Sequence, residues 1–217
     1  MDTKFVVKLG ASLLGVAILA ACGGGNSDSA PTKTGIFVDS AVQGLSYAAE
    51  PSDLRGTTDA AGTFRYQDGD TVSFTVGGIL LGSADGQDKI TPKTLADKAA
   101  PLSATDSANI ASNSGRFLQT FNADGNPDNG IDVTAAAGKF TGAKAVDFNK
   151  APDDFSSDPG YLQAASDAGA TLITSDQAAA HTERSFRSQL AGTWVYRDTD
   201  ALLTVTFFTD GTYLMGG

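Results

Sequence analysis

The stretch TFRYQDGDTVSFTVGGILL, residues 63–81, decides what kind of fold this sequence can adopt. Apolar and polar residues alternate in 63–66 and again in 72–76, a period of two that is typical of strands with one buried face. Gly77 and Gly78 then separate the second run from further apolar residues. Because two glycines can adopt the positive φ angles of a tight β-turn, the stretch predicts a hairpin preceded by another strand.

The preceding residues continue the pattern. Short apolar runs at 36–38 and 45–49 predict two more strands, and Asp68-Gly69 marks a tight turn. Several short strands at this spacing favour a small antiparallel β-sandwich, which we expect over 35–102. With the helical region expected after it, the fold class is α+β.

Two segments in this part, DSAVQGLSY (39–47) and GTTDAAGTFRY (56–66), carry a family resemblance. Together they resemble the carboxypeptidase-regulatory-like, transthyretin-like β-sandwich, over about residues 35–82. The resemblance implies a binding or spacing module without catalytic residues, in which Asp59 and Gly62 shape the turn into the strand of Phe64. Residues 81–95 are also similar to the same region of uncharacterised bacterial surface lipoproteins.

The middle of the chain, 103–189, is expected to be helical with a long loop, after a connector at 92–102. Ile110, Phe117, Leu118 and Phe121 fall on one face of a helix that Thr105-Asp106 can cap. A short helix is expected at 161–168.

A further helix is predicted at 175–189. Thr174 and Gln177 form the S/T-x-x-E/Q pattern of a capping box before it. Ala178, Phe186 and Leu190 are expected on its inner face.

Residues 190–217 return to strand patterns, with Trp194 and Tyr213 as expected inward anchors. The spacing G-T-W…F-x-x-D-G-x-Y resembles the opening strands of a lipocalin-like β-domain. Because two or three strands alone are marginal in water, we expect a partial β-domain and a sequence that is a fragment of a longer protein. The alternative is that these strands complete the earlier sheet.

The first 21 residues have the layout of a secretory leader: Lys4 and Lys8, a short apolar run at 9–19, and small residues at the end. Leu19 fits an ordinary signal-peptidase site poorly. Leu19-Ala20-Ala21-Cys22 instead resembles the bacterial lipobox, which implies cleavage between Ala21 and Cys22.

The lipobox resemblance also implies a diacylglycerol on the Cys22 sulfur and usually an acylated new amino terminus. Two lipid signals are needed for stable anchoring. Residues 22–34, rich in glycine and serine, are expected to form a flexible tether. The residue after the cysteine is Gly23 and not aspartate, which, by resemblance to enterobacterial lipoproteins, implies export to the outer membrane rather than retention at the inner one.

Composition excludes one class of partner. The chain has a net charge of −10 and one cysteine. Removal of 1–21, which carry +1, leaves about −11, so no basic patch for nucleic acid is present. With Cys22 lipidated, the processed chain cannot form a disulfide.

Catalytic patterns are sparse. His181 is the only histidine and lacks the H-E-x-x-H zinc pattern, and no G-x-S-x-G surrounds a serine of the processed chain. We expect His181 to be a packing residue on a helix face and Asp153-Asp154 to be solvated. The sequence therefore predicts a protein that is not an enzyme.

The segment FNADGNPDNGIDV, residues 121–133, raises a metal hypothesis. Oxygen-bearing side chains at alternate positions let a loop wrap Ca²⁺, and the candidate ligands are Asp124, Asn126, Asp128, the Gly130 carbonyl and Asp132. Asn129 and Ala135 stand where an EF-hand has glycine and glutamate. The alternative is a series of turns, since these residues bond their own backbone.

Two functions remain open. The first is a lipid-anchored surface lipoprotein of the outer membrane whose β-modules bind, adhere or space, with a protein or carbohydrate partner. The second is a lipocalin-like carrier or a lipoprotein enzyme whose active part lies beyond residue 217.

Overall fold

A computed structural model describes residues 5–9, 30–99, 103–141, 145–197 and 202–216. The chain forms two compact units, Ala30–Thr182, and Met1–Ser29 together with Glu183–Gly217. Each is treated by itself. The predicted leader cleavage site, Ala21 and Cys22, and most of the predicted tether lie outside the described residues.

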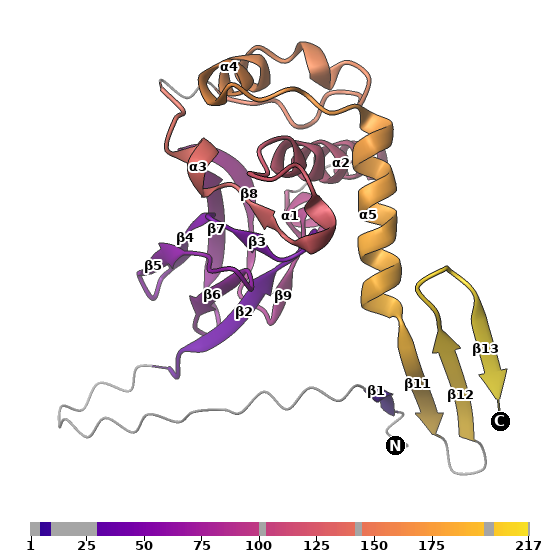
Figure 1. Ribbon diagram of the computed structural model, residues 1–217. Helices are drawn as coiled ribbons and strands as arrows, with labels where there is room; N and C mark the ends of the chain where they lie inside the picture. The colour runs from indigo at the N-terminus through magenta and orange to yellow at the C-terminus, as the bar shows by residue number, and fades with distance from the viewer. Residues whose placement is uncertain (1–4, 10–29, 100–102, 142–144, 198–201, 217) are drawn as a thin grey trace. The chain divides into compact units, whose positions relative to one another are not determined.

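Strands of the first unit form two main sheets, as the sequence predicts. One sheet has the order β5-β4-β7-β8 and the other β6-β2-β9. Figure 1 shows them side by side in the indigo and purple part of the chain. Their bounds are β2 Lys33–Phe37, β3 Val42–Gln43, β4 Ser46–Glu50, β5 Leu54–Thr57, β6 Thr63–Tyr66, β7 Thr71–Val76, β8 Ile79–Asp85 and β9 Lys89–Ile90.

Glycine and aspartate residues in the turns determine how these strands are connected. Gly77 and Gly78 have φ of +54° and +86°, and β7 and β8 pair antiparallel across them, which confirms the predicted hairpin. The Asp59 carboxylate accepts hydrogen bonds from the amides of Ala61 and Thr63, each at 2.9 Å, and directs the chain into β6. Because β6 and β7 lie in different sheets, the turn between them carries the chain from one sheet to the other.

The apolar residues of the alternating pattern form the core between the two sheets. Phe37, Phe64 and Phe74 are fully buried, and the rings of Phe37 and Phe64 lie 4.9 Å and 5.2 Å from that of Phe74. Tilted and edge-to-face aromatic contacts of this kind stabilise a core beyond the area they bury.

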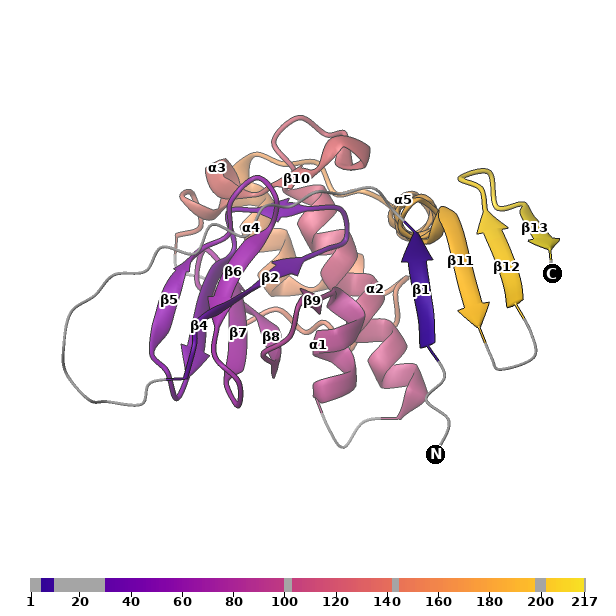
Figure 2. The same cartoon turned by 90° about the horizontal axis from the view of Figure 1, so that it is seen from below.

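Helices continue the same core. Their bounds are α1 Pro92–Lys98, α2 Ala104–Thr120, α3 Thr134–Ala137, α4 Pro159–Ala168 and α5 Ser175–Leu190. Short 3-10 turns, η1 Pro127–Asn129 and η2 Phe155–Ser157, and the strand β10 Ile131–Asp132 lie between them. Figures 1 and 2 show α1 and α2 side by side next to the sheets.

Two details of the helical prediction were wrong. Part of the expected connector is α1, which Thr91 caps and Pro92 begins, since proline at the first helical position costs no hydrogen bond. The cap of α2 is Ser103, in a capping box with Asp106, and not Thr105. The predicted capping box of α5, Thr174 with Gln177, is confirmed.

The second half of α2 is enclosed on all sides. Every residue from 113 to 120 is buried. Phe117 lies 4.7 Å from Phe121 and 5.5 Å from Phe148, ring centre to ring centre. One continuous hydrophobic cluster therefore runs from the sandwich through the helices.

The second unit contains a four-stranded antiparallel sheet. Its strands are β1 Phe5–Leu9, β11 Gly192–Arg197, β12 Leu202–Phe207 and β13 Tyr213–Gly216, in the order β1-β11-β12-β13, as Figure 2 shows. The strands predicted after residue 190 are confirmed. The expected inward positions of Tyr213 and Phe186 were wrong, because these side chains are 62% and 60% exposed.

None of the helices in the described ranges has both the length and the apolar character to cross a membrane.

Candidate functional site

The 122–132 loop borders a pocket of about 260 Å³ in the first unit. The pocket walls combine amide and carboxylate side chains with small apolar ones. They are Ala41, Gln43, Ala60, Asn122, Ala123, Asp124, Asn129, Gly130, Ile131 and Asp132.

Strand β10 fixes this loop to the sandwich. It pairs parallel with β3, and the Ile131 and Val133 amides donate to the carbonyls of Ala41 and Gln43 at 2.9 Å and 3.1 Å. Ile131 and Val133 are buried, so apolar residues at alternate positions hold one wall of the pocket against the core.

Asp124 organises the opposite wall. Its Oδ1 accepts from the Asn126 amide and the Asn122 side-chain amide, each at 2.9 Å, and its Oδ2 accepts from Asn129 Nδ2 at 2.8 Å. These hydrogen bonds lower the pKa of the Asp124 carboxyl, and the hydrogen bond from Asn129 has the largest effect. The loop is thus built around one carboxylate.

Asp128 points to a different partner. Its Oδ1 lies 2.8 Å from Nδ1 of His181, which is 1% exposed and lies on α5. The other ring nitrogen, Nε2, lies 3.1 Å from the Asp39 carbonyl oxygen. His181 therefore bridges the loop and the chain segment just after β2.

Asp39 itself is buried beside α2. Gln119 Nε2 donates to its Oδ2 at 2.8 Å, and the Thr182 hydroxyl lies 3.5 Å from its Oδ1. Burial raises the pKa of Asp39, against the opposing effects of Gln119 and the nearby His181. Gly115 leaves room for the carboxylate, since a Cβ there would lie 3.2 Å from Oδ2.

Ser40, His181 and Asp128 have the residue types of a Ser-His-Asp triad, but their geometry favours another role. Ser40 Oγ is 3.5 Å from Nε2, which is long for a hydrogen bond. The Asp39 carbonyl is closer, at 3.1 Å, and it accepts only. In the tautomer that carries its proton on Nε2, this nitrogen donates to the carbonyl and cannot take the Ser40 proton.

The five predicted calcium ligands lie in one loop, and all four of their side chains make hydrogen bonds within the protein. Asn126 Oδ1 accepts from the Asp128 amide, and Asp132 Oδ1 from the Thr134 amide. Over the described residues, no group of three or more histidine, cysteine, aspartate or glutamate side chains could hold a metal ion. The Asp39–His181 contact joins residues 142 positions apart, and no local pattern in the sequence predicts it.

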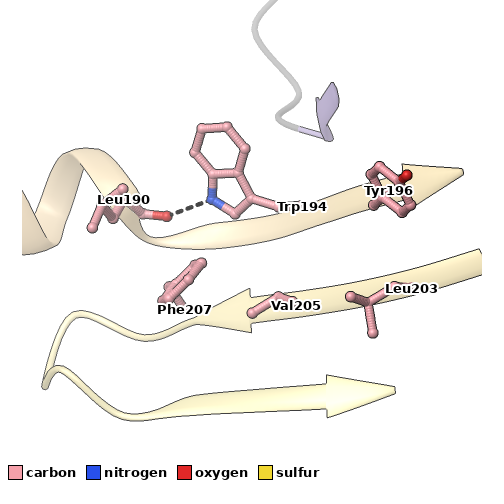
Figure 3. Close-up of a pocket in the computed structure, with 6 residues that line it drawn as sticks. All are labelled: Leu190, Trp194, Tyr196, Leu203, Val205 and Phe207. Carbon is pink, nitrogen blue, oxygen red and sulfur yellow. Dashed lines mark hydrogen bonds between the residues drawn. The ribbon is translucent and has the colours of Figure 1, made fainter. Parts of the chain in front are cut away.

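A second hollow, of about 310 Å³, lies in the other unit and is apolar. We call it the meander groove, and its lining residues are Leu190, Trp194, Tyr196, Leu203, Val205 and Phe207. Figure 3 shows Trp194 and Tyr196 on β11, Leu203, Val205 and Phe207 on β12, and Leu190 at the end of α5. The Trp194 indole N–H donates to the Leu190 carbonyl at 2.9 Å. On β13, Tyr213 and Met215 pair with Phe207 and Val205.

No protein-family model, curated protein or solved structure matches the chain.

Proposed function

We propose that this chain is a lipid-anchored bacterial envelope lipoprotein, held at the outer membrane through Cys22, whose first unit is a non-catalytic binding module. The observation that carries the anchor is Leu19-Ala20-Ala21-Cys22 at the end of a charged and apolar leader. The thiol of Cys22 supplies the nucleophile that lipid transfer needs.

The binding role is supported by the pocket at the 122–132 loop. Loops held on a rigid scaffold are common places for recognition, and β10 ties this loop to a packed sandwich. Gln43, Asn122 and Asn129 offer both donors and acceptors. Such groups suit the polar surface of a protein or carbohydrate partner.

The non-catalytic role is supported by the environment of the only histidine. His181 is enclosed, and both of its ring nitrogens face acceptors that belong to the protein. It links structural elements and offers no free nitrogen toward a substrate.

Weak Ca²⁺ binding by the 122–132 loop is a finer part of the proposal. Asp124, Asn126, Asp132 and the Gly130 carbonyl would supply oxygens, with Asp128 as the fifth ligand. Asp128 would have to leave His181, and this loss is expected to keep the affinity low.

The meander groove favours a second candidate, a lipocalin-like carrier. A hollow of about 310 Å³ lined by six apolar residues has the size and character of a site for an apolar ligand. Binding of a fluorescent fatty acid that is lost in Val205→Asp, and kept in the control Thr206→Asp on the other face, would support it.

Fractionation of cells tests the anchor. Wild-type protein is expected in the outer-membrane fraction, and the Cys22→Ser variant is expected to be an unprocessed or soluble precursor. Ser27→Ala, in the tether, serves as the matched control and should fractionate as wild type. Identical fractionation of wild type and Cys22→Ser would remove the basis of the proposal.

A binding experiment tests the pocket. Asn129→Ala removes a pocket amide, whereas Ser112→Ala changes an exposed position on α2. Processed protein should bind intact cell envelopes or immobilised envelope glycans, and Asn129→Ala should weaken this binding while Ser112→Ala should not. Equal binding by both variants would place the contact elsewhere.

A further inference from the structure

We propose that the outer edge of β11 in the processed chain pairs with β11 of a second copy, which makes a symmetric dimer through antiparallel strands. The proposal rests on the proposed function in one respect: it takes 1–21, and β1 with them, to be removed during lipoprotein processing.

The full chain already shows that this edge accepts a strand. Strand β1 pairs antiparallel with β11 over five residue pairs, from Phe5 opposite Arg197 to Leu9 opposite Thr193. Figure 2 shows β1 beside β11, on the side away from β12. The backbone groups along this side of β11 are therefore placed for an antiparallel ladder.

Removal of β1 would leave that ladder open. Unpaired strand edges recruit other strands, and proteins usually protect them with charges, prolines or bulges. The sequence of β11, GTWVYR, has no proline, and its one charge, Arg197, stands at the end. The exposed edge would have little to keep another strand away.

Strand β11 of a second copy can take the position that β1 occupies beside β11. Two-fold symmetry places identical strands antiparallel, which is the orientation that β1 takes. With Val195 on the symmetry axis, Trp194 would lie opposite Tyr196 of the second copy. Both residues belong to the meander groove, and aromatic cross-strand pairs stabilise a sheet.

The positions of the charged residue Arg197 and of the apolar meander groove favour the same antiparallel register. Arg197 would lie opposite Thr193 of the second copy, so the two arginines would stand roughly 13 Å apart at 3.3 Å per residue. A parallel pairing would place them next to each other. The two meander grooves would join across the axis, because Trp194 and Tyr196 extend the apolar face to the edge of β11.

Single-cysteine cross-linking tests the pairing. Cys22 is the only cysteine, so the full chain with Cys22→Ser and Val195→Cys has one thiol. A disulfide needs Cβ atoms within about 4.5 Å, which a directly opposed cross-strand pair reaches. The same chain with Val7→Pro loses an amide hydrogen of β1, which should weaken the β1–β11 ladder and open the edge.

Mild oxidation of the purified full chain should then give several-fold more disulfide dimer with Val7→Pro than without it. A mixture of chains carrying Thr193→Cys or Arg197→Cys, each with Cys22→Ser and Val7→Pro, should form the mixed disulfide. Equal cross-linking with and without Val7→Pro, or none with it in either design, would overturn the inference. So would cross-linking through Met215→Cys on β13 in place of β11.

A parallel arm separates this inference from the proposed function. Processed protein from cells, with Val195→Cys alone, has its remaining thiol at 195 once Cys22 is lipidated. Its mass shows whether the leader is gone. A retained leader together with cross-linking in the Val7→Pro chain would defeat the proposed function, and it would show that β11 pairs with a second copy once its edge is open. A removed leader without cross-linking through 195 would defeat the inference.

Discussion

At the scale of single residues, the site is assembled around Asp39. This residue carries a carboxylate, is enclosed by protein and is 6% exposed. Burial of a charge is costly unless hydrogen bonds and nearby charges compensate it. Gln119 and Thr182 face its two oxygens, and His181 lies against its carbonyl. The cluster therefore fixes the geometry beneath the 122–132 loop at some expense of stability.

Replacement of this carboxylate should stabilise the protein. Because burial raises the pKa of Asp39 above 3.8, the folded state holds the proton more tightly than the unfolded state. Asp39 thus favours folding below 3.8 and opposes it as the pH rises through its folded value. Asp39→Asn has no such charge, and its amide can donate to Gln119 Oε1, a buried acceptor without a partner.

The expected result is a higher free energy of unfolding in urea for Asp39→Asn than for wild type at neutral pH. The difference should shrink as the pH falls toward 3.8. Asp153→Asn, at an exposed loop position, is the control and should follow wild type. A pH-independent difference would refute the assigned cause.

The calcium proposal belongs to the same scale. Calorimetry on the processed protein should show Ca²⁺ binding at about 10⁻⁴ to 10⁻³ M, as in weak extracellular sites. The double variant Asp124→Ala and Asp128→Ala should show none, and Asp153→Ala should bind as wild type. Absence of heat at millimolar Ca²⁺, or equal heat from the double variant and wild type, would leave the segment as a series of turns.

Helix α2 is the element on which both parts of the first unit depend. Its residues 113–120 are buried on every side. Arg116 donates to the Ile173 and Pro152 carbonyls at 2.7 Å and 3.0 Å, and to the Ser156 hydroxyl at 2.7 Å. The helix thereby holds irregular chain in place as well as filling the core.

Phe117→Ala should test this dependence. The ring is fully buried among other aromatic side chains, and truncation of such a residue typically costs about 3–5 kcal/mol of unfolding free energy. Ser112→Ala, exposed on the same helix, should change it by less than about 0.5 kcal/mol. Chemical denaturation measures both, and similar values for the two variants would contradict the buried position of α2.

Elements with a strong local pattern could be predicted from the sequence. Strands β6 and β7 follow a period of two, and α5 has its capping box, so each was found near its observed bounds. Helix α1 was missed because its alanine and lysine content suited a connector, although Thr91-Pro92 is a helix start. The inward positions predicted for Tyr213 and Phe186 were wrong. A periodic pattern shows that a strand or helix has an apolar face, but it does not show which part of the protein covers that face.

The site could be predicted only in part, for a related reason. The 122–132 loop could be predicted because asparagine, aspartate and glycine follow one another closely in its sequence. Its contact with His181 joins residues 53 positions apart, and the contact of His181 with Asp39 joins residues 142 apart. Such pairs arise from the tertiary fold and leave no local signal in one sequence.

The described part of the chain consists of a packed α+β unit and a unit whose four-stranded sheet carries the apolar meander groove. The unit Ala30–Thr182 has one hydrophobic cluster shared by sheets and helices, so its sandwich and its helices should unfold together. The unit with Glu183–Gly217 has little comparable burial, as every residue of β13 is exposed.

At this scale the proposal predicts no hydrolase activity. The processed protein should show no turnover on panels of esters, peptides and glycosides, because His181 is bound on both sides within the protein. Wild type and His181→Gln should give the same background signal. Turnover that is abolished by replacing His181 or Asp153 would establish an enzyme.

The most direct test of the anchored lipoprotein is the intact mass of the protein extracted from the outer membrane. We predict a chain that begins at Cys22, lacks 1–21, and carries the added mass of a thioether-linked diacylglycerol and an amide-linked acyl chain. Fragmentation should place both additions on residue 22. A chain that still contains the leader, or one with an unmodified Cys22, would contradict the central claim.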